Sequence, residues 1–115
     1  VTLMVEFKVP KGTEIEKMTK KSLVSYIYVG KPTREWRARV GSGTQIQLND
    51  KFASLFEVQD YVFQEREAMK EIDKPFMKVS LKVDRDTRMG IVTDIKQELR
   101  KAWALNINYS ADNRN

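Results

Sequence analysis

The chain has 115 residues, 41% of them hydrophobic, which suits one domain with a single modest core. It contains no histidine and no cysteine, which excludes histidine-based catalysis, ordinary zinc sites, thiol chemistry and disulfide bonds within this sequence. The formal net charge is +5, but 16 acidic residues are interspersed among 21 basic ones, a pattern typical of a solvated surface rather than a dedicated anion-binding protein.

Residues 1–20 are predicted to be a linker segment. The opening VTLMVEFKVP alternates apolar and polar positions like a strand, and its abrupt start is also what a fragment following a removed membrane anchor would show. No run approaches the ~20 apolar residues that a transmembrane helix needs. Residues 10–21 are polar, with a short helical turn expected near Glu14.

Residues 21–110 are predicted to form the folded domain. Leu23, Ser25, Ile27 and Val29 have the spacing of one strand face. Residues 44–48 form a second expected strand that ends at Asn49-Asp50. The long connection between the two contains glycine-rich turns, and its Trp36 and Val40 are expected to extend the two strands.

The longest helical pattern runs from Lys51 to Lys70, with Leu55, Val58, Val62 and Met69 on one face. Ser54 and Glu57 have the spacing of a capping box. Pro75 cannot continue this helix, so we expect it to mark the approach to the next strand.

The stretch from residue 79 to 110 predicts a β-α-β unit. Three apolar residues alternate in the expected strand: Val79, Leu81 and Val83. Five recur at helical spacing: Ile91, Val92, Ile95, Leu99 and Ala102. A closing strand is expected over residues 105–110. The expected fold is therefore α+β. It is a two-layer sandwich in which a four-stranded sheet carries two helices on one face, in the order β-β-α-β-α-β. Residues 111–115 are predicted to be a disordered tail.

The turn before the second helix carries Asp84, Arg85 and Asp86. Two carboxylates with an arginine between them are too few ligands for a divalent cation, so we predict that Asp86 or Thr87 caps the helix instead. Gly90 is expected to permit a close turn or a close helix–strand contact. No residues are predicted to be catalytic, to ligate metal or to bind a cofactor.

A basic cluster surrounds Trp36: Lys31, Arg34, Arg37 and Arg39. It could neutralise phosphates and stack on bases, as nucleic-acid binders do, or meet a cell-wall polymer or anionic lipid. We favour a solvent-exposed hairpin in which an arginine covers Trp36 by a cation–π contact.

The order of short motifs resembles the periplasmic domain of the ExbD/TolR family, the small subunits of proton-driven inner-membrane motors. Family members have a strand ending in Leu-Asn-Gly before a Ser-led helix, where this chain has Leu48-Asn49-Asp50 before Ser54. They also have a strand ending in Ala-Asp and a turn ending in Tyr-Gly, where this chain has Val83-Asp84 and Met89-Gly90. The resemblance covers roughly residues 21–110 and implies that the first two strands are antiparallel.

The resemblance implies a non-enzymatic, ExbD-type subunit that works with an ExbB-like proton-channel subunit and energises TonB for outer-membrane transport. It implies a homodimer in the inner membrane, with this domain in the periplasm and the membrane helix outside this sequence. The family's proton-carrying aspartate lies in that helix, so no residue here takes its role, and Met89 replaces the family's tyrosine. The alternatives are a TolR-like envelope-integrity subunit that contacts peptidoglycan, and a small basic nucleic-acid-binding domain, although we expect no nucleic-acid partner.

The closing strand is the expected contact surface. Between Ala104 and Ser110 there is no proline and no charged residue, so nothing in the segment opposes pairing with another chain. We predict that Leu105, Ile107 and Tyr109 contribute to homodimerisation at the sheet edge and that TonB binds there by strand addition.

Overall fold

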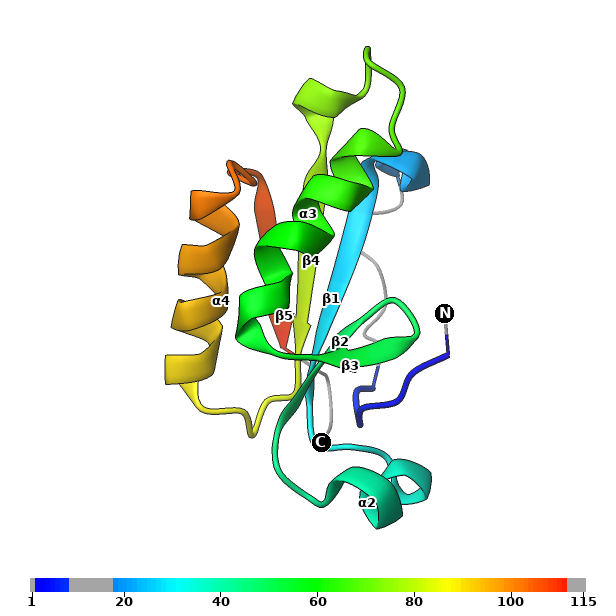
Figure 1. Ribbon diagram of the computed structural model, residues 1–115, viewed down its shortest axis with the longest axis vertical. Coiled ribbons are helices and arrows are strands. Elements are labelled where there is room, and N and C mark those ends of the chain that lie inside the picture. Colours follow the sequence, from blue (N-terminus) through cyan, green and yellow to red (C-terminus); the bar gives the residue numbers. More distant parts are fainter. Residues whose placement is uncertain (1, 9–17, 112–115) are drawn as a thin grey trace.

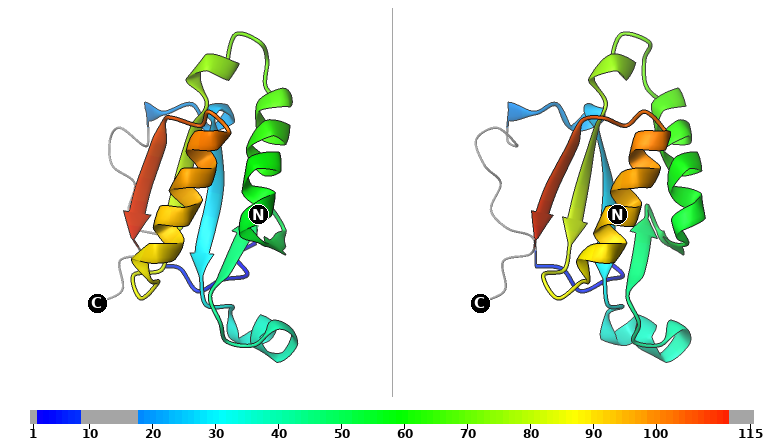
Figure 2. Two further views of the ribbon diagram at one scale, coloured as in Figure 1. Left: turned by 60° about the vertical axis from the view of Figure 1, so that its left-hand side comes forward. Right: turned by 90° about the vertical axis from the view of Figure 1, so that its left-hand side faces the viewer.

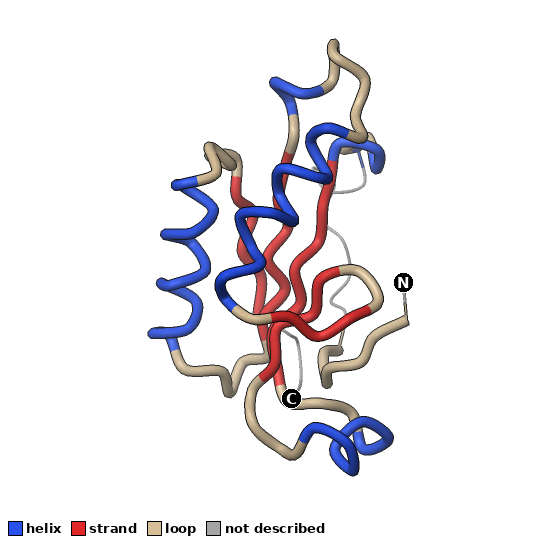
Figure 3. Tube along the Cα trace, in the orientation of Figure 1, coloured by secondary structure: helices blue, strands red, loops and turns tan. Residues whose placement is uncertain are grey.

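A mixed sheet of five strands runs through the residues that this computed structural model describes, 2–8 and 18–111 (Figure 1). Its spatial order is β3-β2-β1-β4-β5. The strands are β1 (Val24–Gly30), β2 (Gln45–Leu48), β3 (Lys51–Ala53), β4 (Lys78–Val83) and β5 (Ile107–Ala111). The α-helices are α2 (Arg34–Val40), α3 (Val58–Glu67) and α4 (Met89–Lys101), and 3-10 turns cover Lys21–Leu23, Leu55–Glu57 and Lys74–Phe76 (Figure 3).

The connections between strands place the two longer helices on one face. β1 pairs antiparallel with β2 but parallel with β4, and β4 pairs parallel with β5. Each parallel step requires a crossover connection, which α3 and α4 supply, and right-handed crossovers bring both helices to the same side. Figure 2 shows them side by side against the sheet.

The core lies between the sheet and these two helices, as the apolar spacing predicted. The buried helical side chains are Val58, Tyr61, Val62, Val92, Ile95 and Leu99. They meet Ile27, Val29, Val79, Leu81 and Val83 from the two central strands. Because β1 and β4 are flanked by strands on both sides, their inward residues are completely shielded from solvent.

The sheet has five strands rather than the predicted four, and the difference lies in residues 51–53. Asn49 adopts a positive φ of 53°, which lets Asn49-Asp50 form a two-residue turn and fold β3 back antiparallel to β2. The helix therefore begins later than expected. The predicted Ser54–Glu57 capping box is present and separates strand from helix, with the Ser54 N–H donating to the Glu57 carboxylate at 2.7 Å.

The connection after β1 contains a helix where we predicted strand extensions. Trp36 and Val40 are four residues apart in α2, and Trp36 packs edge-on against Phe52 of β3 with ring centroids 5.6 Å apart. Gly41 ends the helix at a φ of 81°, a conformation that glycine adopts readily. The sequence pattern failed here because seven residues are too few for a helical period to stand out.

Residues 2–8, within the predicted linker, lie against the sheet face opposite to α3 and α4. Met4, Val5 and Phe7 are buried, and Phe7 meets the ring of Tyr28. The side-chain amide of Gln47 accepts from the Met4 N–H at 2.8 Å and donates to the Thr2 carbonyl at 2.9 Å. The expected helical turn near Glu14, and most of the expected tail, fall on residues outside those described.

Candidate functional site

Strand β5 forms one edge of the sheet in the described part of the chain. It pairs with β4 on one side, with Val79 opposite Ile107 and Leu81 opposite Tyr109. Both side chains therefore lie on the helix face, where Ile107 packs on the core and the Lys96 ammonium lies 5.0 Å from the ring centre of Tyr109. The predicted contact strand thus lies at an edge, and it begins two residues later than expected, at Ile107.

The direction of the hydrogen bonds along β5 determines which of its backbone N–H and C=O groups point away from β4. The Val79 N–H donates to the Asn106 carbonyl at 3.0 Å, which directs the backbone of Asn106 toward β4. In a parallel ladder the direction alternates along the strand, so Asn108 and Ser110 also face β4. The N–H and C=O groups of Ile107, Tyr109 and Ala111 consequently point outward from the sheet.

Leu105 lies outside the strand, contrary to the prediction, because the end of α4 occupies the preceding residues. The Trp103 N–H donates to the Arg100 carbonyl and the Ala104 N–H to the Leu99 carbonyl, the two bonds of a Schellman motif. Trp103 holds the left-handed position at φ 59°, where glycine is usual and a larger residue costs about 1 kcal/mol. The residue is nevertheless 77% exposed.

A groove of about 520 Å³ lies beside β5 on the face away from the helices. β1 contributes Tyr26, β4 contributes Lys78, Ser80 and Lys82, and residues 106–110 form the opposite wall. A second groove, of about 460 Å³, lies at the end of α4 and is lined by Arg66, Lys74, Pro75, Met77 and residues 103–106, so that it shares Asn106 with the first.

The turn before α4 is built differently from the prediction. Arg88, not Asp86 or Thr87, is the N-cap residue, and no side chain caps the helix. Asp84 is buried and organises the turn: its carbonyl accepts from the Thr87 N–H at 2.9 Å, and its carboxylate lies 3.5 Å from the Asp86 N–H. The expectation for Gly90 is also wrong, since nothing lies within 4 Å of where its Cβ would be. These residues shape a turn and bring no ligand set together.

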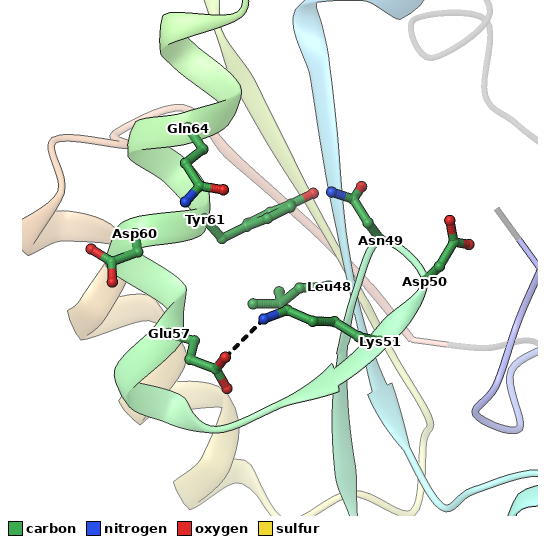
Figure 4. A pocket seen from close by; sticks show the side chains of 8 residues that line it. All are labelled: Leu48, Asn49, Asp50, Lys51, Glu57, Asp60, Tyr61 and Gln64. Atoms are coloured by element: carbon green, nitrogen blue, oxygen red, sulfur yellow. Dashed lines mark hydrogen bonds and ion pairs between the residues drawn. The ribbon is translucent and has the colours of Figure 1, made fainter.

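A third cavity, of about 420 Å³, lies between the β2–β3 hairpin and α3 (Figure 4). The Lys51 ammonium reaches across it to Glu57 at 2.9 Å, and this hydrogen bond, followed by the one from Ser54, lowers the pKa of the Glu57 carboxyl. The Tyr61 hydroxyl donates to the Tyr26 carbonyl at 2.7 Å, and burial raises the pKa of the phenol. Lys51 and Glu57 therefore join the hairpin to the turn before α3, and Tyr61 joins α3 to β1.

The basic side chains around Trp36 make different contacts from one another. Arg39 lies 5.1 Å from the centre of the Trp36 ring, the predicted cation–π contact, although on a helix rather than a hairpin. Arg37 pairs with Glu6 and donates to the Pro32 carbonyl at 3.1 Å, which ties α2 to the N-terminal segment. Two of the four basic side chains thus serve the fold.

The described residues contain no group of three or more acidic side chains arranged to hold a metal ion. None of the helices in residues 2–8 and 18–111 is long and apolar enough to span a bilayer. No model of a known protein family matches the sequence, and a search of curated proteins gives no significant match.

Sequence reasoning missed three positions that the structure makes important: Gly30, Gln47 and Trp103. A glycine at a strand end and a glutamine within a strand are common in sequences and carry no signal of their own. Trp103 had a signal: a bulky residue directly after the C-cap residue Ala102, at the position where glycine is usual.

Proposed function

We propose that this chain is the periplasmic domain of an ExbD-type subunit of a proton-driven motor that energises TonB-dependent transport across the outer membrane. In this proposal the domain is not an enzyme. Its partners are a second copy of itself, an ExbB-like proton-channel subunit and TonB, and a membrane helix outside this sequence anchors it in the inner membrane. The resemblance in motif order supports the family, and the α+β fold is compatible with it.

The observation that carries the protein-binding role is the outward backbone of β5. Ile107, Tyr109 and Ala111 present a row of donors and acceptors that matches an extended peptide, and the grooves beside β5 provide space for its side chains. Main-chain hydrogen bonds would supply affinity, and the side-chain grooves would supply specificity. Homodimerisation and binding of a TonB segment would both use this edge.

Tyr109→Pro tests this role. Proline removes the outward N–H without breaking a bond to β4, and edge strands accept proline where the N–H faces solvent. We expect the variant to stay folded, to lose its dimer in sedimentation and to bind a peptide from the periplasmic segment of TonB at least about tenfold more weakly.

Tyr109→Val is the matched control, because it removes the ring and keeps the N–H. Asn108→Pro tests the assigned direction, since it removes a bond to β4 and should lower the stability of the fold. If folded Tyr109→Pro keeps both its dimer and its peptide affinity, strand addition at β5 is wrong. An apolar helix carrying an aspartate, encoded directly before Val1, would support the family assignment independently.

A further inference from the structure

Trp103 has a backbone conformation that its contribution to folding does not explain. The Schellman motif needs a positive φ at residue 103, and glycine would adopt it without strain. The indole makes no ring–ring or cation–ring contact with a described residue, and Trp103 is 77% exposed. Strain combined with an exposed aromatic ring is expected when a side chain is kept for a partner.

The groove beside Trp103 is apolar apart from Asn106 and two basic side chains whose charged ends are already engaged. The Arg66 guanidinium donates to the Ala102 carbonyl at 2.9 Å, and the Lys74 ammonium pairs with Glu71 at 2.6 Å. Because both charges have partners within the fold, the two side chains contribute mainly their aliphatic stems to the groove. The apolar lining residues are Pro75, Met77, Trp103, Ala104 and Leu105. The groove therefore favours apolar surface rather than charge.

The lining residues of this groove differ in exposure. Met77 and Ala104 are buried, whereas Leu105 is 67% exposed and Trp103 more so. The backbone that carries them is held in place, since the Ala104 N–H donates to the Leu99 carbonyl at 2.9 Å. A side chain inserted here would therefore meet a buried apolar floor and two exposed apolar neighbours, and the supported backbone would lose little conformational entropy.

The groove adjoins the open edge of β5 through Leu105 and Asn106. Leu105 stands two positions before Ile107, whose N–H and C=O groups point away from β4, and its own backbone makes no hydrogen bond with a described residue. Figure 2 shows the loop after α4 leading directly into this strand. An extended segment that pairs with Ile107 and Tyr109 can therefore continue past Leu105, which brings its next side chains to the groove.

We infer that the groove at the end of α4 binds one large apolar side chain of the extended polypeptide segment that adds to β5. That side chain packs on Met77, beside Trp103 and Leu105. The inference rests on the proposed function for the strand addition, and it adds that the segment is selected by an apolar residue just beyond its paired part. An anionic lipid surface is less well matched, because the charged ends of Arg66 and Lys74 are engaged within the fold and the apolar lining is concave.

The test uses the whole chain and two labelled, uncharged peptides. Both alternate threonine with valine to favour an added strand, and one carries phenylalanine at both ends where the other carries serine. Phenylalanine stands at both ends because a segment can add to β5 in either direction. We expect the phenylalanine peptide to bind at least about tenfold more tightly, the usual effect of burying one aromatic side chain. This ratio should change little between low and high salt, because no charge is recognised.

Trp103→Gly separates binding from folding. We expect it to weaken the phenylalanine peptide at least about tenfold and to leave the serine peptide unchanged, while the melting temperature stays the same or rises. Leu105→Ser, in the same groove, should act in the same direction. Phe56→Ala is the matched control, because Phe56 is 86% exposed in the turn before α3 and lies outside the groove, so both affinities should stay unchanged. Equal affinity of the wild type for the two peptides, or full affinity in Trp103→Gly, would overturn the inference.

Further outcomes separate this inference from the proposed function. If both peptides bind equally and both are lost in Tyr109→Pro, the edge binds strands and the inferred role of the groove is wrong. If the phenylalanine peptide needs Trp103 but not the Tyr109 N–H, the groove is supported and strand addition is wrong. Binding of neither peptide to the wild type would contradict both. Binding of phosphatidylglycerol vesicles that depends on Trp103, without binding of either peptide, would replace the partner segment with a lipid surface.

Discussion

At the end of β1, a Cβ atom on Gly30 would lie 3.0 Å from the Cβ of Asp84 and 3.0 Å from the carbonyl oxygen of Glu6. Neither neighbour has room to move. The Asp84 N–H donates to the Val29 carbonyl at 2.8 Å, and the Glu6 N–H donates to the Lys31 carbonyl at 2.7 Å. The smallest residue is therefore required where the N-terminal segment, β1 and the turn after β4 come together.

We expect Gly30→Ala to lower the free energy of unfolding by about 1–3 kcal/mol, the usual effect of inserting a methyl group into a packed site. Chemical denaturation measures it. Gly90→Ala is the control, because its Cβ would meet nothing within 4 Å and α4 should gain up to about 1 kcal/mol. A neutral Gly30→Ala would mean that the N-terminal segment does not approach β1 this closely in solution.

At the scale of whole elements, α3 and α4 are joined by a polar contact at the rim of their apolar interface. The Gln59 amide donates to the Glu98 carboxylate at 2.9 Å, and Lys101 donates to its other oxygen at 3.0 Å. The hydrogen bond from Gln59, and then the one from Lys101, lower the pKa of Glu98 from its ordinary 4.5. The folded chain therefore keeps this carboxylate ionised at a lower pH than the unfolded chain does.

A group with a lowered folded pKa contributes stability that is present above its unfolded pKa and lost as the pH falls through its folded pKa. Glu98→Gln should thus be less stable than the wild type at pH 7, and the difference should close below pH 4.5. Urea midpoints measured from neutral to acid pH test this. Glu35→Gln, on the exposed side of α2, is the control and should show no such pH-dependent difference. A gap between wild type and Glu98→Gln that persists in acid would contradict the assigned pair.

At the scale of the whole molecule, Gln47 connects the N-terminal segment to the sheet. Its side chain is completely buried and bonds Met4, Thr2 and its own neighbour Asn49. Buried amides in such positions are costly to leave unsatisfied, at about 1–3 kcal/mol for each lost partner. The sheet face away from α3 and α4 is therefore divided: residues 2–8 occupy the side near β2, and the groove lined by Tyr26, Ser80 and Asn108 occupies the side near β5.

Gln47→Leu should release residues 2–8 while the sheet and both long helices remain folded, because leucine has a similar volume but no hydrogen-bonding groups. Hydrogen exchange is the measurement, with faster exchange expected at Met4 and Glu6 and little change in β4. Gln45→Leu, on the same strand face but only partly buried, is the matched control. Unchanged protection at Met4 in Gln47→Leu would show that apolar contacts alone hold the segment.

Local sequence patterns determined the elements whose stability comes from long apolar periods. Three predicted features are present in the structure, since each depends on neighbours in the sequence. They are the helical stripe of Val92, Ile95 and Leu99, the strand alternation of Val79, Leu81 and Val83, and the Ser54–Glu57 capping box. Where the segment was short, the prediction failed. Residues 51–53 form a strand because they pair with β2, and residues 34–40 form a helix whose Trp36 packs on Phe52. Neither partner can be recognised from the local sequence pattern.

The candidate site was decided mostly by tertiary structure. The sequence identified residues 105–110 as an uncharged strand, but its edge position and the outward direction of Ile107 and Tyr109 follow from pairing with β4, 28 residues earlier in the chain. The groove at the end of α4 brings together Arg66, Pro75 and Trp103, which are far apart in the sequence, and no local spacing encodes that arrangement. Composition alone excluded histidine and cysteine chemistry, since an absent side chain is absent in every fold. Which surfaces remain open to a partner depends on what the fold covers, and only the packed chain decides that.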